Sequence, residues 1–194
     1  ARSSDVSKRG TRRRASATET FPIVGVGASA GGLDAFKKLF STMPGDCGIA
    51  FVLIQHLDPT RKSLTAELVG AYTPMRVIQA KQGMRIEPNH VYVIPPNRYL
   101  TIHDLTLRLS APAEPRSLRM AVDYFFRSLA ADKGERAIGI VLSGTGTDGT
   151  LGLREVKAAG GVTMVQDPET AQHDGMPRSA IATGCADYVV PAEQ

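Results

Sequence analysis

Short, continuous apolar runs alternate along this chain with segments of helical periodicity, and this alternation constrains the fold most strongly. Runs of this length that are rich in β-branched residues are typical of strands buried on both faces of a parallel sheet. The runs span residues 23–26, 49–54, 138–142, 162–165 and 188–190.

Between these runs, apolar residues recur three and four positions apart, which is the spacing of one face of a helix. Alternating strands and helices predict a doubly wound α/β fold, a mainly parallel sheet with helices on both faces. The strongest helical patterns are Leu33, Phe36, Phe40 and Met43, and Val122, Phe125, Phe126 and Leu129.

Residues 91–110 have a different pattern. Three short strand candidates, 91–94, 99–102 and 106–109, are separated only by turn residues. Strands so close together in the chain cannot be joined by helical crossovers. We therefore predict a short antiparallel excursion around residues 91–110.

The basic charge is confined to one end of the chain. Residues 1–20 contain six basic and two acidic side chains, whereas the other 174 residues contain 17 of each. The segment 1–20 has almost no apolar residues and is predicted to be a disordered tail or linker. Residues 21–194 form one folded domain with no net charge, which argues against a nucleic-acid partner.

No apolar run is long enough to span a bilayer, so we predict no membrane insertion. The start of the chain lacks the apolar region of a signal peptide. Cys47 and Cys185 show neither a disulfide pattern nor a metal-ligand spacing. These features favour a cytoplasmic protein with reduced thiols.

Three of the predicted strands end in reactive side chains. The first leads into Gly-Ala-Ser-Ala-Gly-Gly, which contains Ser29 and matches the G-x-S-x-G nucleophile elbow. The second ends at His56, and the strand 138–142 leads into a loop that contains Asp148. Because the carboxyl ends of parallel strands lie at one edge of a sheet, these three side chains are predicted to lie close together.

These residue types suit nucleophilic catalysis. A serine hydroxyl needs an adjacent base to remove its proton, and imidazole is suited to this near neutral pH. A buried carboxylate holds the imidazole in its working tautomer. The helix after Ser29 points N–H groups to where an oxyanion would form, and the Ala30 N–H is the first expected donor.

Each candidate also has a purely structural interpretation. Ser29 could cap the helix that follows it, and Asp148 could cap the helix after its own loop. Asp167, which also follows an apolar run, is the main alternative to Asp148. His173, in a polar loop, is the alternative to His56.

A dinucleotide-binding function is a second interpretation. Residues 144–149 match G-x-G-x-x-G between a strand and a helix, and Asp167 lies where a ribose-binding acid belongs. However, Asp148 would place a carboxylate inside a loop meant for a pyrophosphate, where like charges repel. This interpretation also leaves Ser29 and His56 without a function.

The order of the motifs resembles that of the CheB-type protein-glutamate methylesterases. The matching segments are 27–32, 55–56, 143–149 and 175–178, and the resemblance extends over residues 21–191. Two further segments, 55–59 and 93–98, are similar to the methylesterase module of hybrid methylesterase–methyltransferase proteins.

The resemblance implies roles for particular residues. It makes Ser29 the nucleophile, His56 the base and Asp148 the acid of a catalytic triad. The backbone N–H groups of Ala30 and Thr145 become the oxyanion donors. Well-known chemotaxis members have Met where this chain has Thr145, which preserves the backbone donor but alters the pocket wall.

The resemblance also implies a reaction and its partners. The reaction is hydrolysis of glutamate γ-methyl esters, and in some members deamidation of glutamines, on methyl-accepting chemotaxis receptors. It implies no metal and no organic cofactor, and a methyltransferase module in the same polypeptide. No receiver domain precedes Phe21 in this sequence. A module that binds receptors without turnover is the remaining alternative.

Overall fold

The computed structural model describes residues 21–55, 64–115 and 118–194, in which strands and helices alternate. The basic segment 1–20, with its predicted disorder, lies outside the described residues. The strands are β1 (Ile23–Ala28), β2 (Ala50–Gln55), β3 (Arg76–Gln79), β4 (His90–Val93), β5 (Tyr99–His103), β6 (Thr106–Ser110), β7 (Ala137–Val141), β8 (Val162–Gln166) and β9 (Tyr188–Val190). The α-helices are α1 (Gly32–Ser41), α2 (Thr65–Gly70), α3 (Ala121–Lys133), α4 (Thr150–Ala158) and α5 (Gly175–Ala182).

Seven strands form one parallel sheet in the order β3-β4-β2-β1-β7-β8-β9. The chain builds outward from β1 through β2 to the β3–β4 edge, and then returns to β7 on the other side of β1. The strand order therefore reverses between β1 and β7. Crevices for ligands form at such a switch point, beyond the carboxyl ends of the strands.

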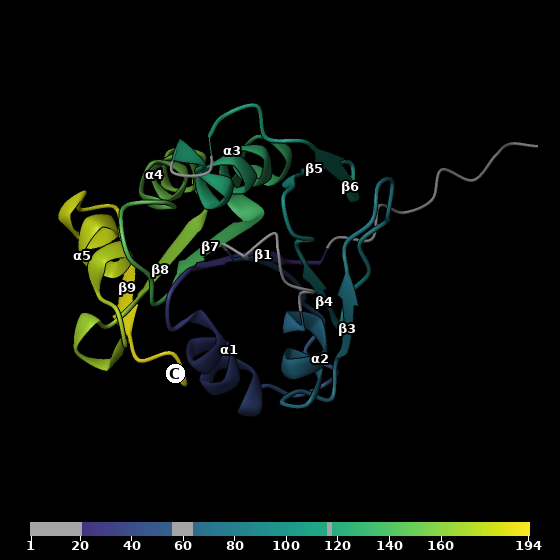
Figure 1. Cartoon of the computed structure of the whole chain (residues 1–194), viewed down its shortest axis with the longest axis horizontal. Helices are drawn as coiled ribbons and strands as arrows, with labels where there is room; N and C mark the ends of the chain where they lie inside the picture. Colours follow the sequence, from purple (N-terminus) through teal and green to yellow (C-terminus); the bar gives the residue numbers. More distant parts are fainter. Residues whose placement is uncertain (1–20, 56–63, 116–117) are drawn as a thin grey trace, which may run out of the picture.

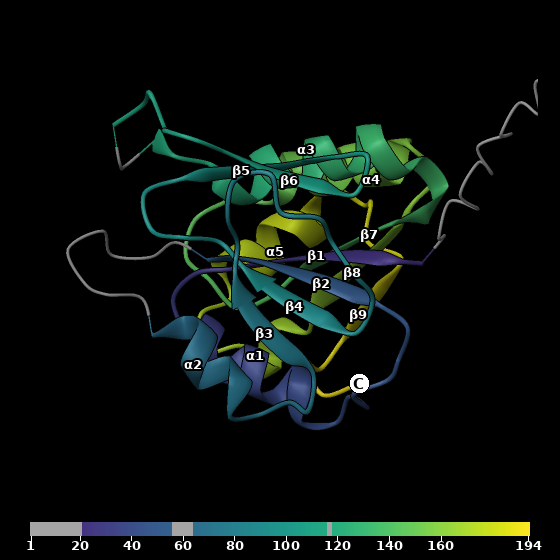
Figure 2. The same ribbon diagram turned by 90° about the vertical axis from the view of Figure 1, so that its right-hand side faces the viewer.

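Helices cover both faces of this sheet. Helices α1 and α2 lie on one face, and α3, α4 and α5 pack on the other together with the β5–β6 hairpin (Figures 1 and 2). The predicted doubly wound α/β fold is confirmed.

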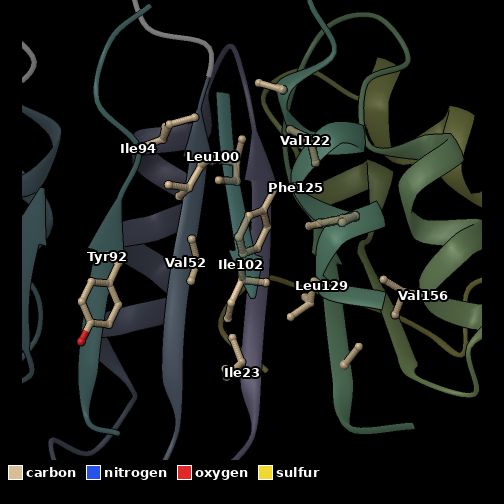
Figure 3. Close-up of a cluster of buried hydrophobic side chains, with 14 of the residues drawn as sticks. Ile23, Val52, Tyr92, Ile94, Leu100, Ile102, Val122, Phe125, Leu129 and Val156 are labelled. Atoms are coloured by element: carbon tan, nitrogen blue, oxygen red, sulfur yellow. The ribbon is translucent and has the colours of Figure 1, made fainter. Parts of the chain in front are cut away.

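The larger core lies between the sheet and the α3 side. Phe125 and Leu129 from α3 and Leu100 from the hairpin pack against Ile23 and Val52 of the sheet (Figure 3). All five side chains are fully buried. Burial of each contributes about 1.5–3 kcal/mol, which fixes α3 relative to the strand ends.

Two details of the sheet differ from the sequence-based prediction. The antiparallel pairing involves β5 and β6, with one isolated antiparallel bridge between Arg85 and Thr106. The run expected at 91–94 instead forms β4 and pairs in parallel with β2 and β3. Its apolar residues are buried on both faces, as in the central strands. The edge strand β3 was not predicted, because only its two central residues are apolar.

Candidate active site

The register of the sheet brings three strand ends to one level. Ala28 at the end of β1 is paired with Gln55 of β2, and Gly27 is paired with Val141 of β7. Ser29 therefore emerges at the middle of the sheet edge, between the ends of the two neighbouring strands. His56, the predicted base, follows Gln55 directly and lies outside the described residues.

A tight turn holds Ser29 at the entrance to α1. The Gly32 N–H donates a hydrogen bond to the Ser29 carbonyl (3.0 Å), and the Ser29 N–H donates to the Ser143 carbonyl (3.0 Å). Gly31 has φ of +75° in this turn. A residue with a side chain is strained there, which explains why the elbow requires glycine.

Ser29 is not the cap of the following helix. The N-cap position of α1 is Gly31, and no side chain caps it by a hydrogen bond. The structural alternative considered for Ser29 is therefore wrong.

The loop after β7 packs directly against the nucleophile candidate. A Cβ atom placed on Gly144 would lie 3.0 Å from the Ser29 Cβ and 2.1 Å from the Met176 Sδ. Only glycine permits this approach. Its neighbour Thr145, the second predicted oxyanion donor, therefore lies on the loop in contact with Ser29.

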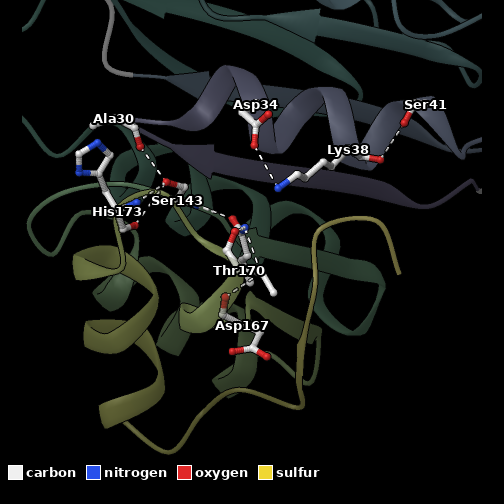
Figure 4. A network of polar contacts seen from close by, with 9 residues as sticks. Ala30, Asp34, Lys38, Ser41, Ser143, Asp167, Thr170 and His173 are labelled. Atoms are coloured by element: carbon white, nitrogen blue, oxygen red, sulfur yellow. Dashed lines mark hydrogen bonds and ion pairs between the residues drawn. The ribbon is translucent and has the colours of Figure 1, made fainter.

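Ser143 is a polar residue whose role the sequence reasoning missed. Its hydroxyl donates to the Ala30 carbonyl (2.9 Å) and accepts the His173 N–H (3.0 Å), as Figure 4 shows. Its own N–H donates to the Gln166 side chain (2.9 Å). The buried Ser143 thus links the elbow, the end of β8 and the 172–174 loop; its position directly after β7 was the available signal.

Asp148 is buried and bound to the first turn of α3. Its Oδ2 accepts the Val122 N–H and its Oδ1 accepts the Asp123 N–H, both at 2.9 Å. It therefore caps α3 and not the helix after its own loop, α4, whose N-cap residue is Gly149. These two N–H donors fix the orientation of the carboxylate at the sheet edge.

A second buried carboxylate lies beside Asp148. The Asp123 Oδ1 accepts the Gly152 N–H from the first turn of α4 at 2.6 Å. Burial raises the pKa of the Asp123 carboxyl, the hydrogen bond from Gly152 lowers it, and the charge of Asp148 raises it further. Asp123 was not singled out in the sequence because it follows the pattern of an ordinary first-turn acid.

The backbone N–H groups of Ala30 and Thr145 are the two predicted oxyanion donors. Within residues 21–55, 64–115 and 118–194, neither the Ala30 N–H nor the Thr145 N–H donates a hydrogen bond. The hydrogen bond from Ser143 to the Ala30 carbonyl restrains the peptide that follows Ala30. Donors that are ordered before the reaction are the ones that stabilise an oxyanion most effectively.

The alternative acid and base have structural roles. The Asp167 side chain accepts the Glu169 N–H (3.0 Å) and caps a short 3₁₀ turn after β8. His173 contributes its backbone to the Ser143 network, and its carbonyl accepts the Gly144 N–H (2.9 Å). Its exposed imidazole lies on the same side of the network as Ala30 (Figure 4).

A small cavity of about 50 Å³ lies beside the end of β2. Its wall includes Gln55, the residue before the predicted base, and the Arg119 guanidinium. Arg119 donates to the Asn97 side chain (2.6 Å) and to the Glu114 carbonyl (3.1 Å). The cavity is also lined by Ile94, Pro95, Pro96, Arg98, Tyr99, Pro112 and Ala121.

In the described part of the chain, the residues that could hold a metal ion together are His103, Asp104 and Asp132. His103 and Asp104 lie at the turn of the β5–β6 hairpin, and Asp132 lies near the end of α3. The Asp104 N–H donates to the Asp132 Oδ1 (2.9 Å), and the Lys133 ammonium is 3.0 Å from the Asp132 Oδ2. These contacts anchor the hairpin to α3, and none involves the site around Ser29.

An α/β protein with a serine on a glycine turn at its topological switch point, in contact with a loop that carries a buried carboxylate, has the architecture of the doubly wound serine hydrolases. Comparison with known proteins identifies a particular family within this class. The family model described as CheB methylesterase matches residues 24–194, and the chain belongs to this family.

Individual relatives agree with this assignment. A protein-glutamate methylesterase/protein-glutamine glutaminase of Photorhabdus laumondii is 37% identical over 173 residues, which are 87% of this chain and 49% of that protein. A Leptospira interrogans relative is 34% identical over 170 residues, 87% of this chain and 88% of the relative. The crystal structure of the Thermotoga maritima CheB methylesterase catalytic domain superposes with a TM-score of 0.84 at 30% identity, covering 90% of this chain and 94% of that domain.

The chain spans only part of several relatives. It covers about half of the Photorhabdus protein. A Rhodobacter capsulatus protein of 104.1 kDa is 46% identical over 129 residues, which are 13% of its length. Among the described helices, none combines the length and the apolar character needed to cross a membrane.

Proposed function

We propose that this domain hydrolyses glutamate γ-methyl esters on a protein substrate, with Ser29, His56 and Asp148 as its catalytic triad. The observation that carries the proposal is the position of Ser29. It projects from a glycine turn between the ends of β2 and β7 and contacts the loop that leads to Asp148. Relatives are named protein-glutamate methylesterase/protein-glutamine glutaminase, which supports a glutamate methyl ester as the substrate and a glutamine amide as a second one.

The first half of the reaction forms an acyl-enzyme. The Ser29 Oγ attacks the γ-carbonyl carbon while His56 removes the hydroxyl proton. The N–H groups of Ala30 and Thr145 stabilise the negative oxygen of the tetrahedral intermediate. When the intermediate collapses, the C–O bond to the methoxy group breaks, and His56 returns the proton to the departing methanol.

The second half regenerates the enzyme. His56 removes a proton from water, and the resulting hydroxide attacks the γ-glutamyl ester of Ser29. Collapse releases the glutamate carboxylate and returns the proton to the Ser29 Oγ. Asp148 orients the imidazole and stabilises its protonated form in both halves. An amide substrate follows the same steps with ammonia as the leaving group, which is the glutaminase reaction.

The substrate protein in this proposal is a methyl-accepting chemotaxis receptor or a related sensor. The resemblance of segments 55–59 and 93–98 to hybrid proteins supports a methyltransferase module in the same polypeptide. A cytoplasmic location follows from this partner. None of these steps requires a cofactor.

A fluorophosphonate probe, which forms a covalent adduct with an activated serine, tests the nucleophile. We expect one adduct by intact mass on the wild-type protein and none on Ser29→Ala or His56→Ala. Ser41→Ala, which changes an exposed serine at the end of α1, is the matched control and should label normally. An adduct that persists in Ser29→Ala would disprove the assignment.

Turnover separates an esterase from a module that only binds receptors. The assay measures methanol released from the methylated cytoplasmic domain of a chemotaxis receptor. A protein that labels with the probe and releases methanol is the proposed enzyme. Binding of the receptor without labelling and without methanol would show a non-catalytic module, whereas saturable NAD(H) binding would support the dinucleotide alternative.

A further inference from the structure

A groove of about 430 Å³ lies beside the Asp148 loop, between the N-terminal ends of α3 and α4. It is separate from the small cavity next to β2, although both share Tyr99. Its lining residues are Tyr99, Glu114, Leu118, Met120, Asp123, Tyr124, Arg127, Thr147, Thr150 and Leu151.

Exposed apolar side chains are concentrated in this groove. Four of the nine large hydrophobic residues that are exposed in the described ranges line it. They are Leu118, Met120, Tyr124 and Leu151, with exposed fractions of 63%, 41%, 40% and 47%. Scattered single apolar residues need no explanation, but a group of them in one concave site marks a binding surface.

Contacts within the chain hold the aromatic wall of the groove. The Tyr124 ring stacks on the Tyr99 ring, with centroids 4.4 Å apart. The Tyr99 hydroxyl donates to the Glu114 carboxylate (3.1 Å), which holds the hydroxyl end of the Tyr99 ring. Rigid aromatic residues with an arginine nearby, here Arg127, are the residues that dominate the energy of protein interfaces.

The groove adjoins the proposed active site. Thr147 and Thr150, which line it, stand on either side of the Asp148–Gly149 pair in the chain. The Asp148 carboxylate caps the same turn of α3 that supplies Tyr124 to the groove wall. A polypeptide that presents an ester to Ser29 at this sheet edge therefore has the groove beside it.

We propose that the groove binds an apolar side chain of the substrate protein that lies next to the modified glutamate. This inference rests on the proposed function. A γ-glutamyl methyl ester is too small to distinguish one protein from another, so recognition requires contacts outside the reacting group. The groove lies beside the loop that carries Asp148 and presents four exposed apolar side chains, so it can provide those contacts.

Two variants test the groove: Tyr124→Ala removes the stacked ring, and Leu151→Ser removes an exposed apolar group from α4. The matched control is Tyr188→Ala, which changes a tyrosine of similar exposure (55%) on the edge strand β9. For each variant, kcat/KM is measured with the methylated receptor domain and with p-nitrophenyl acetate, a small ester that lacks the flanking polypeptide of the receptor.

The two substrates should respond differently. We expect each groove variant to lose about tenfold or more in kcat/KM on the receptor beyond any loss on the small ester, mainly through KM, as for the central residues of an interface. Tyr188→Ala should match the wild type on both substrates. Equal losses on both substrates, or no loss on the receptor, would overturn the proposal.

A binding measurement separates this inference from the proposed function. Ser29→Ala binds the substrate without turnover, so its Kd for the methylated receptor domain can be compared with that of Ser29→Ala/Tyr124→Ala. A weaker Kd in the double variant supports the groove even if the wild type releases no methanol. An unchanged Kd refutes the groove and leaves the esterase assignment intact.

Discussion

Asp148 and Asp123 cap each other's helices. Asp148, at the end of the loop before α4, accepts the Val122 and Asp123 N–H groups at the start of α3. Asp123, in α3, accepts the Gly152 N–H at the start of α4. The proposed triad acid is therefore held by the pairing of two helices. Its orientation depends on the same contacts that join α3 and α4.

Replacing the triad acid should separate its chemical role from its capping role. Asp148→Asn keeps a carbonyl oxygen for one of the two N–H donors and should lower the free energy of unfolding by about 1–2 kcal/mol. It should lower kcat far more, by about 10⁴, as the same change does in a serine protease triad. Urea unfolding and methanol release measure the two effects.

Asp167→Asn is the control for this prediction. Asp167 also caps a turn with its side chain, at the end of the neighbouring strand β8. The substitution Asp167→Asn should therefore lower the free energy of unfolding slightly but leave kcat close to that of the wild type. If Asp167→Asn removes activity and Asp148→Asn does not, the assignment of the acid is wrong.

The buried Asp123 predicts a pH dependence of stability. Because burial raises its pKa in the folded state, its ionisation costs stability as pH rises from the unfolded pKa through the folded pKa. Asp123→Asn removes this cost while its amide oxygen can still accept the Gly152 N–H. The free energy of unfolding of Asp123→Asn, relative to the wild type, should therefore rise from pH 4 to pH 7. Urea titrations at each pH measure it, and a relative stability that is constant or falls with pH would contradict the interpretation.

The main sheet was predictable because its central strands are continuous apolar runs. β1 and β2 are buried on both faces, which requires such runs, and β7 is also a continuous apolar run although only its alternate residues are fully buried. β3 was missed because it is an edge strand whose first and last residues are exposed. Its place in the sheet depends on pairing with β4, which a local pattern does not report.

The positions of the site residues were predictable only where a residue directly follows a strand. The position of Ser29 on the edge follows from its place after β1 and from the parallel register. The hydrogen-bond donors to Asp148 could not be predicted from the sequence. They are 25 and 26 positions away and are brought close by tertiary packing. The bonds of the Ser143 hydroxyl span 30 and 113 positions, for the same reason.

The Ser143 hydroxyl should matter for positioning the elbow. Ser143→Ala leaves the His173 N–H without its acceptor and frees the Ala30 carbonyl, which should cost about 1–3 kcal/mol of stability. Displacement of the oxyanion donors should also lower kcat, by up to about 10²-fold. Thermal unfolding and methanol release at substrate saturation measure the two effects.

Ser128→Ala is a close control for Ser143→Ala. The Ser128 hydroxyl donates to the Phe125 carbonyl (2.8 Å) and accepts the Ile102 N–H (3.2 Å), the same bonding pattern on α3, away from the elbow. It should show a similar loss of stability with a normal kcat. Parallel losses of kcat in both variants would mean that Ser143 acts only through general stability.

Two glycines with the same backbone angle allow strain to be separated from crowding at the elbow. Gly31 and Gly48 both have φ of +75°, so alanine at either position should cost about 1–2 kcal/mol. A Cβ at Gly31 would lie 2.6 Å from the Ser143 Oγ, whereas one at Gly48 would have nothing within 4 Å. Gly31→Ala should therefore also displace the elbow and lose most fluorophosphonate labelling, while Gly48→Ala labels at the wild-type rate. Equal labelling of the two variants would show that the elbow tolerates the added methyl group, and that the contact between Gly31 and Ser143 does not position the nucleophile.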